Sequence, residues 1–265
     1  MGILNVTPDS FSDGGRYLKP QDAIDHALRM IDEGAHLIDI GGESTRPGSK
    51  PVPVDQQKKR VLPVIEALVK KNKKIVLSID TQDSEVAGAA LAAGASMVND
   101  ISALQNDPEI AAVCTKHKAA VVLMHMQNKP ETMQENPRYV DIVSEVKTFL
   151  QSRIEAAEKA GIAPESIVVD VGIGFGKSVN HNLVLVREMS QFHALGKPLL
   201  AGLSRKSFIG KVLEIDDPAE RIIGTAAATA WCVAGNVQIL RVHDVKEMKQ
   251  VAQIIQAIGA GRQVK

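Results

Sequence analysis

Three basic residues of this sequence have the types and spacing of an anion-binding site: Arg46, Arg241 and His243. Arg241 and His243 are two residues apart, so on a β-strand their side chains point to the same face. Arg46 lies in a long segment rich in glycine and proline, which could bring it to the same place. Guanidinium groups bind phosphate oxygens with paired hydrogen bonds, so we predict a phosphate or pyrophosphate site. A surface salt bridge is the alternative for Arg46.

Polar residues also end each of eight short apolar runs in the chain. Any one of them could simply cap the helix that follows. Because all eight runs end in this way, capping alone is a poor explanation, and we predict that these residues share one site. They are Asn5, Asp39, Asp80, Asn99 with Asp100, His125, Asp170, Ser204 with Arg205 and Lys206, and Arg241 with His243.

The eight apolar runs are candidate β-strands, and segments with helical periodicity separate them. Apolar residues recur at three- and four-residue spacing, as at Ala23, Ala27 and Met30, which is typical of amphipathic helices. Asp107 and Asp217 each precede a proline, a common helix start. The runs cover residues 2–6, 37–40, 75–79, 97–101, 119–124, 167–171, 198–203 and 237–242.

Eight strand–helix units in 265 residues predict an α/β fold, a (β/α)8 TIM barrel that residues 1–265 form as a single domain. Buried parallel strands read as continuous apolar runs, as these do. In such barrels the chemistry lies at the C-terminal ends of the strands, where the polar residues stand. A doubly wound open sheet is the alternative, but its glycine-rich first turn is absent from residues 7–10, which read Thr-Pro-Asp-Ser.

Two segments, residues 7–18 and 41–54, are too long and too rich in special residues to be simple connectors. We predict that they are mobile lids that close over bound substrate and exclude water, with solvated surface loops as the alternative. Phe11, Phe175 and Phe208 fall in segments that follow strands. They could line a pocket for a flat aromatic ligand, or anchor their own loops.

The segment 172–178 reads Gly-Ile-Gly-Phe-Gly-Lys-Ser and superficially suggests nucleotide binding. A P-loop requires glycine where Val171 stands, and a dinucleotide fingerprint requires it where Lys177 stands. The alternating glycines are better explained as a tight backbone turn beneath a ligand held by Asp170. The histidines and cysteines have no spacing suited to zinc.

Composition favours a small-molecule partner. Lysine plus arginine equals aspartate plus glutamate, at 31 each, so no overall field attracts nucleic acid or an anionic membrane. Two cysteines are too few for a disulfide framework, and no apolar run reaches the roughly 18 residues of a membrane span. No secretory leader is visible at the first residues, so we expect a cytoplasmic protein.

Several of these segments resemble the signature stretches of the dihydropteroate synthase family, in the family's order along almost the whole chain. Residues 3–15 read ILNVTPDSFSDGG and residues 40–48 read IGGESTRPG, each long enough to exclude coincidence. Shorter matches occur at residues 99–101, 123–127, 204–207 and 241–245. The resemblance implies a TIM-barrel transferase of folate biosynthesis that joins a dihydropterin diphosphate to p-aminobenzoate. It also implies magnesium, a homodimer and a target of sulfonamides.

The resemblance carries roles over to matching positions. The residues that match those holding the pterin ring are Asp80, Asn99, Asp170 and Lys206. The groups around the pyrophosphate are matched by Thr45, Arg46, Arg241 and His243, and the residue near magnesium by Asn5. The p-aminobenzoate pocket is matched by Phe175, Lys206, Ser207 and Pro47, and the lids contain Asp9, Phe11, Arg46 and Pro47. The catalytic set is then Arg46, Lys206, Arg241 and His243. Of these, Arg46, Arg241 and His243 would stabilise the departing pyrophosphate together with magnesium.

The segment after the sixth run departs from the family pattern. Val171 stands where proline is common, and Ile173 where phenylalanine is common, so we expect altered loop geometry. Two other functions fit part of the pattern. A pterin-dependent methyltransferase on the same barrel would lack the TPDSFSDGG stretch and the Ser204–Ser207 stretch. A catalytically silent pterin-binding module would have lost Arg46, Asn5 or Lys206, and none is lost.

Overall fold

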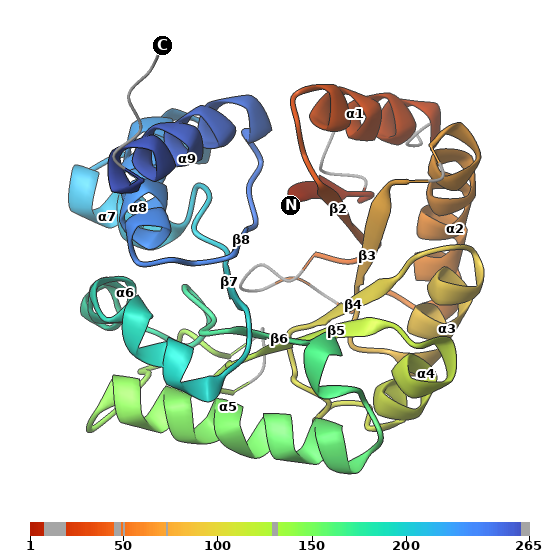
Figure 1. The fold of residues 1–265 in the computed structure, drawn as a ribbon, viewed down its shortest axis with the longest axis horizontal. Helices are drawn as coiled ribbons and strands as arrows, with labels where there is room; N and C mark the ends of the chain where they lie inside the picture. The colour runs from red at the N-terminus through yellow and green to blue at the C-terminus, as the bar shows by residue number, and fades with distance from the viewer. Residues whose placement is uncertain (8–19, 45–48, 50, 73, 129–131, 261–265) are drawn as a thin grey trace.

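The protein folds as a closed ring of eight parallel strands surrounded by helices (Figure 1). This computed structural model describes residues 1–7, 20–44, 49, 51–72, 74–128 and 132–260. Each strand pairs with the next in chain order, and a parallel bridge between Gly2 and Val242 joins the last strand to the first. The amide of Ile3 donates to the Val242 carbonyl at 3.0 Å across this closure. The predicted (β/α)8 barrel is therefore confirmed.

All eight predicted strands form, each within about two residues of its predicted bounds or shorter. They are β1 Gly2–Asn5, β2 Leu37–Gly41, β3 Val76–Asp80, β4 Met97–Asp100, β5 Ala120–Met124, β6 Ile167–Asp170, β7 Leu199–Ala201 and β8 Ile239–Leu240.

Helices alternate with the strands and cover the outside of the barrel (Figure 1). The α-helices are α1 Pro20–Asp32, α2 Val54–Lys71, α3 Ser84–Ala92, α4 Glu109–His117, α5 Ile142–Lys159, α6 Val179–Arg187, α7 Ser207–Leu213, α8 Ile222–Ala234 and α9 Val245–Gly259. Three 3-10 helices are η1 Pro164–Ser166, η2 Met189–Leu195 and η3 Pro218–Arg221. Asp107 and Asp217 accept hydrogen bonds from the amides of Glu109 and Ala219, as expected of helix starts.

The barrel interior has an apolar floor beneath a polar layer. Met97, Val168 and Leu200 belong to a small buried cluster inside the ring, separate from the large core between strands and helices. Successive strand residues point to opposite faces, so residues two positions further along also point inward. Asn99 and Asp170 follow Met97 and Val168 at that spacing. The strand pattern therefore places polar side chains at the C-terminal mouth of the barrel.

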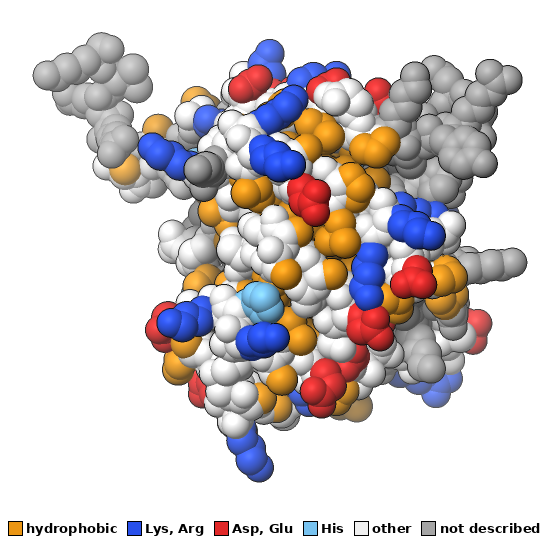
Figure 2. All heavy atoms as spheres, turned by 90° about the vertical axis from the view of Figure 1, so that its right-hand side faces the viewer, with side chains coloured by type: hydrophobic (Ala, Val, Ile, Leu, Met, Phe, Trp, Pro, Cys, Tyr) orange, Lys and Arg blue, Asp and Glu red, His pale blue; other side chains and the backbone are white. Residues whose placement is uncertain are grey.

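Charge on the outside is mixed. On the face that includes α2, α3 and α4, lysine and arginine side chains lie among aspartates and glutamates (Figure 2). Of the described helices, none combines the length and apolar character that crossing a membrane would require.

Candidate active site

Arg241, just past β8, joins acids from two other strands at the barrel mouth. Its Nε lies 2.6 Å from Asp39 Oδ2, and its Nη2 lies 2.7 Å from Asp80 Oδ2. Asn99, on β4, donates from Nδ2 to the same oxygen of Asp39 at 3.0 Å. Asp39, Asp80 and Asn99 are all buried. Four strands thus bring one cation, two acids and an amide into contact.

One guanidinium pairs with two carboxylates here, so some carboxylate oxygens remain without a hydrogen-bond donor. Asp39 Oδ1 and Asp80 Oδ1 are buried and have no hydrogen-bond partner within the described part of the chain. Burial raises the pKa of Asp80 to about 7; the positive charge of Arg241 lowers this pKa, and the negative charge of Asp39 raises it. Burial opposes the charge of Arg241, but Asp39 and Asp80 outweigh it and raise its pKa. Buried acceptors without partners are costly and mark a place where N–H donors would bind.

A second group of predicted residues meets across the ends of β6 and β7. Asp170 Oδ1 accepts a hydrogen bond from the Gly172 amide at 2.7 Å, which fixes the carboxylate. Lys206 Nζ lies 4.0 Å from the centre of the Phe175 ring, a cation–π contact. Burial lowers the pKa of Lys206 to about 8, while Asp170 acts in the opposite direction. Burial also raises the pKa of Asp170.

The two groups share one mouth. The charges of Arg241 and Asp80 both influence Lys206, and that of Arg241 influences Asp170. Gly202 follows β7 two residues after the inward-facing Leu200, and a methyl group built on it would meet no atom of the described residues within 4 Å. Open space therefore lies above β7, between the β6 and β8 ends that carry Asp170 and Arg241.

The remaining predicted residues occupy different positions. His243 lies two residues after Arg241, and its Nδ1 is 2.9 Å from Ser204 Oγ. Ser207 is the exposed first residue of α7. Asn5 ends β1, where its Oδ1 would lie 3.6 Å from a methyl group on Gly41. Asp9, Phe11, Thr45, Arg46 and Pro47 lie outside the described residues.

Among the described residues, no group of three or more histidine, cysteine, aspartate or glutamate side chains could hold a metal ion. The amide oxygen of Asn5 is nevertheless a hard ligand at the barrel mouth, of the kind that magnesium accepts alongside phosphate oxygens and water. The residues present therefore fit a magnesium ion that a substrate diphosphate would help to hold.

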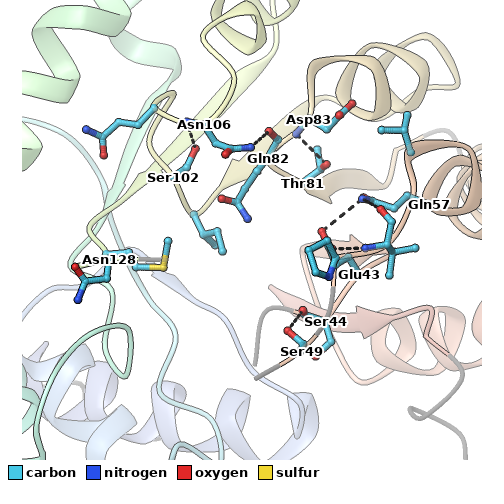
Figure 3. A pocket seen from close by; sticks show the side chains of 16 residues that line it. Glu43, Ser44, Ser49, Gln57, Thr81, Gln82, Asp83, Ser102, Asn106 and Asn128 are labelled. Atoms are coloured by element: carbon cyan, nitrogen blue, oxygen red, sulfur yellow. Dashed lines mark hydrogen bonds between the residues drawn. The ribbon is translucent and has the colours of Figure 1, made fainter. Parts of the chain in front are cut away.

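The base of the segment after β2 is fastened to α2. Glu43 accepts hydrogen bonds from the Val52 amide at 2.7 Å and from Gln57 Nε2 at 3.4 Å. Arg60 donates to the Gly42 carbonyl at 2.7 Å. A hollow of about 460 Å³ opens beside this base, between the segments that follow β2, β3, β4 and β5 (Figure 3). None of the described residues predicted for the site lines it.

Asp100, at the end of β4, does not join the mouth and does not cap the next helix, but holds the turn that follows its strand. Its Oδ1 accepts from the amide and hydroxyl of Ser102, and its Oδ2 accepts from the Leu104 amide at 2.6 Å. These bonds hold a turn in which Ala103 and Leu104 both have positive φ angles, of 52° and 65°. Asp100 is fully buried and faces away from the mouth, since its neighbour Asn99 faces inward.

We therefore expect Asp100→Ala to lower the free energy of unfolding by about 3 kcal/mol, because it strands buried donors and releases a strained turn. Urea unfolding followed by circular dichroism measures this change. Asp107→Ala, at a half-buried helix start where Asp107 also accepts from the Ser84 amide, serves as the control and should cost about 1 kcal/mol. Equal losses in the two variants would contradict the role given to Asp100.

Two contacts of this region were not predicted from the sequence. Lys177, which entered only as a mismatch to nucleotide-binding motifs, is buried and hydrogen-bonded to His125 Nδ1 at 2.9 Å. Asp39 was placed at a strand end without a role, yet it pairs with Arg241. Asp39 lies two residues after Leu37 on the same strand, so its side chain points into the barrel, and this spacing could have identified it as a site residue. Phe208 is buried in the large core, so it anchors its helix.

The barrel and its acid-lined mouth define a TIM-barrel enzyme with a small-molecule site at the C-terminal ends of its strands. A family model described as "Pterin binding enzyme" matches residues 1–243. The dihydropteroate synthase of Synechocystis sp. is 47% identical over 258 residues, covering 97% of this chain and 89% of that protein. That of Escherichia coli is 44% identical over 257 residues, with 97% and 90% covered.

Solved structures agree. A Yersinia pestis dihydropteroate synthase in complex with a sulfonamide drug matches with a TM-score of 0.92 and 43% identity, covering 98% of this chain and 93% of that one. A Xanthomonas albilineans dihydropteroate synthase with 4-aminobenzoic acid gives 0.91 and 45%, with 98% and 92% covered. The chain belongs to the dihydropteroate synthase family of pterin-binding enzymes. Its activity is accordingly that of a transferase in folate biosynthesis.

Proposed function

We propose that this chain joins (7,8-dihydropterin-6-yl)methyl diphosphate to p-aminobenzoate at the barrel mouth, giving 7,8-dihydropteroate and pyrophosphate. The observation that carries the proposal is the set of buried acceptors, Asp80 Oδ1 among them, beside the cations Arg241 and Lys206. An edge rich in N–H donors needs such fixed acceptors. Structures of the Xanthomonas albilineans relative hold 4-aminobenzoic acid in one case and 7,8-dihydropteroate in another.

The pterin ring would lie in the open space above β7, with its amino-pyrimidine edge toward the acids. Asp170 and Asp80 accept hydrogen bonds from that edge, and Asn99 and Lys206 contact the ring. The Gly172 amide already fixes the rotation of Asp170, so little side-chain order is lost on binding. The arrangement recognises a flat heterocycle by its donors rather than by apolar contact alone.

The amine would bind next to the ring, against Phe175, Lys206 and Ser207. The cation–π contact already holds Phe175 and Lys206 together, so they form a pre-arranged wall for a flat aromatic molecule. Lys206 also offers a positive charge for the carboxylate of p-aminobenzoate. Pro47 and Phe11, from the two segments that we propose as lids, would complete this pocket, and Asp9 and Arg46 would close with them.

The difficult step is departure of the diphosphate, since an aromatic amine is already unprotonated near neutral pH. Arg241 has five N–H groups; bonds to Asp39 and Asp80 use two of them, and the others remain for diphosphate oxygens. Arg46 and His243 supply further charge, and Thr45 a hydroxyl donor. Magnesium held near Asn5 would neutralise charge on the same group. The acids then stabilise positive charge developing on the pterin, and the lids exclude water.

We further propose that residues 1–265 form one domain and that two copies pair through α6, α7 and α8. These three helices contact one another, and they carry large exposed apolar side chains. Ile223 is 77% exposed and Trp231 is 57% exposed, both on α8. Sedimentation equilibrium of Ile223→Glu against the unaltered chain tests the pairing. A monomer in both samples would contradict it.

A cytoplasmic location is also proposed. Cys114 and Cys232 are buried free thiols, which suits a reducing compartment. Fractionation of cells that produce the full-length protein tests the location, and recovery outside the cytoplasm would contradict it.

One assay tests the reaction itself. We expect the purified protein to release pyrophosphate from the dihydropterin diphosphate only when p-aminobenzoate and a divalent cation are both present. The absorption spectrum and the chromatographic elution of the pterin product should be those of a conjugate of both substrates. Pyrophosphate release that is indifferent to the amine would rule out the proposed reaction.

A further inference from the structure

The loop after β6 is held by an unusual number of side chains. Three successive carbonyl groups, of residues 174–176, accept hydrogen bonds from Gln134 at 2.6 Å, Lys177 at 2.9 Å and Tyr139 at 2.9 Å. The glycines at 172, 174 and 176 all have positive φ angles, of 70°, 83° and 64°. Alternating conformations of this kind turn each carbonyl toward a different neighbour. The loop therefore depends for its shape on side-chain donors, two of them from outside it and one, Lys177, from its own end.

Lys177 is the buried member of these donors. Its Nζ lies 2.9 Å from His125 Nδ1, 3.3 Å from the His125 carbonyl and 2.9 Å from the Phe175 carbonyl. An ammonium group has three donors, so these acceptors satisfy it completely. Only 3% of Lys177 is exposed, so water does not replace these contacts. When Lys177 is protonated, the arrangement needs a neutral His125 with its proton on Nε2. Burial lowers the pKa of the His125 ring to about 3 and that of Lys177 to about 7, the latter against the effect of Asp170.

Lys177 links the end of β5 to the ring of Phe175. A methyl group on Gly172 would lie 1.8 Å from the His125 carbonyl, so the loop rests directly on β5. The Phe175 carbonyl is bound to Lys177, and the Phe175 ring carries Lys206 at 4.0 Å. A continuous set of contacts therefore runs from His125 through Lys177 to the pair that faces the mouth.

The position of Asp170 is set by contacts other than those of Lys177, although burial raises the pKa of Asp170 and the charge of Lys177 acts to lower it. Asp170 belongs to β6, and its carbonyl accepts from the His125 amide at 3.0 Å, continuing the pairing of β5 with β6. Its carboxylate is held by the Gly172 amide, at the start of the loop. Losing the Lys177 contacts should therefore move Phe175 and leave Asp170 in place.

We propose that Lys177 is a positioning residue for the aromatic amine, holding Phe175 and through it Lys206 where the amine binds. The inference rests on the proposed function, because it takes Phe175 and Lys206 as the amine pocket. Lys177 itself is too deeply buried to touch substrate. It acts chiefly on recognition of the amine, because Asp80, Asp170 and Asn99 hold the pterin without it. Only the contact of Lys206 is shared between the two substrates.

Lys177→Met tests this separation, since methionine keeps the length and burial of the side chain and removes its donors. We expect the KM for p-aminobenzoate to rise at least about ten-fold. The kcat at saturating amine and the pterin affinity measured by calorimetry should stay within about three-fold. A folded variant with an unchanged KM for the amine would overturn the proposal.

Lys197→Met is the matched control. Lys197 is also largely buried and donates to Glu158 at 2.7 Å and to the Pro164 carbonyl at 2.8 Å, but just before β7, at the opposite end of the barrel. It should lose thermal stability as Lys177→Met does without changing the KM for the amine. Equal KM increases in both variants would reduce Lys177 to a structural role and overturn the proposal.

If Lys177→Met does not fold, two variants of His125 carry the test. Asparagine offers an acceptor near the position of Nδ1, and leucine does not. We expect His125→Leu to raise the KM for the amine and His125→Asn to keep it within about three-fold. An unchanged KM in both would overturn the proposal. Wild-type protein without amine-dependent pyrophosphate release would overturn the proposed function and this inference together, whereas an active wild type isolates the inference.

Discussion

Asp170→Asn is expected to weaken binding of the dihydropterin diphosphate by at least about a hundred-fold. The substitution replaces an acceptor-only carboxylate with an amide that must present N–H groups to a ligand edge that is itself made of donors. Hydrogen bonds to a charged group are worth about 1.5–3 kcal/mol each, and the amino-pyrimidine edge offers more than one. Titration calorimetry in the absence of p-aminobenzoate measures the loss directly.

The fold should survive this change, because an asparagine oxygen can still accept from the Gly172 amide at the 2.7 Å position of Asp170 Oδ1. Asp141→Asn is the matched control. Asp141 caps α5 on the surface, where asparagine caps equally well. Its pterin affinity should equal that of the wild type. An Asp170→Asn protein that binds pterin normally would remove Asp170 from the site.

Arg241→Ala is expected to lower the free energy of unfolding by about 3–5 kcal/mol and to abolish activity. The reason is the pairing at 2.6 Å with Asp39 and 2.7 Å with Asp80, both buried. Removing the cation leaves Asp39 and Asp80 together without compensation, and the pKa of Asp80 rises further. Either an unpaired buried charge remains or a proton must be taken up, and both are costlier than losing the contacts alone. Thermal and urea unfolding near neutral pH measure the stability loss.

A second substitution separates repulsion from other causes. Adding Asp39→Asn to Arg241→Ala removes one of the two unpaired charges, so it should recover part of the lost stability without restoring pyrophosphate release. Arg241→Lys keeps the charge but has one nitrogen where two are used, and should retain stability better than activity. A double variant no more stable than Arg241→Ala would contradict the electrostatic explanation.

The strand pattern was predictable because buried parallel strands are continuous apolar runs with polar residues at one end. The sequence also indicated which side chains point into the barrel, because Asn99 and Asp170 follow the inward-facing Met97 and Val168 by two residues. The residue types alone could not decide which of the polar residues at a strand end faces the mouth and which holds a turn. Asn99 and Asp100 are adjacent and equally polar, yet one faces the mouth and the other caps a turn.

Contacts between distant segments were beyond prediction from the residue pattern. The pairing of Arg241 with Asp39 spans 202 positions, and the Lys177 contact with His125 spans 52. Both depend on strand register, which a local pattern does not fix. Val171 and Ile173, the departures from the family pattern, are buried in the large core at 0% and 1% exposure. Apolar side chains at these positions anchor a loop that outside donors also hold.

The most direct measurement is the position of a bound dihydropterin in a crystal of this protein. We predict that the ring lies above β7, with its amino-pyrimidine edge on Asp170 and Asp80 and its side chain toward Arg241. Density for the ring in the hollow of about 460 Å³ beside Glu43 and Gln57 would contradict that placement. So would a ring in the mouth whose amino-pyrimidine edge points away from both acids.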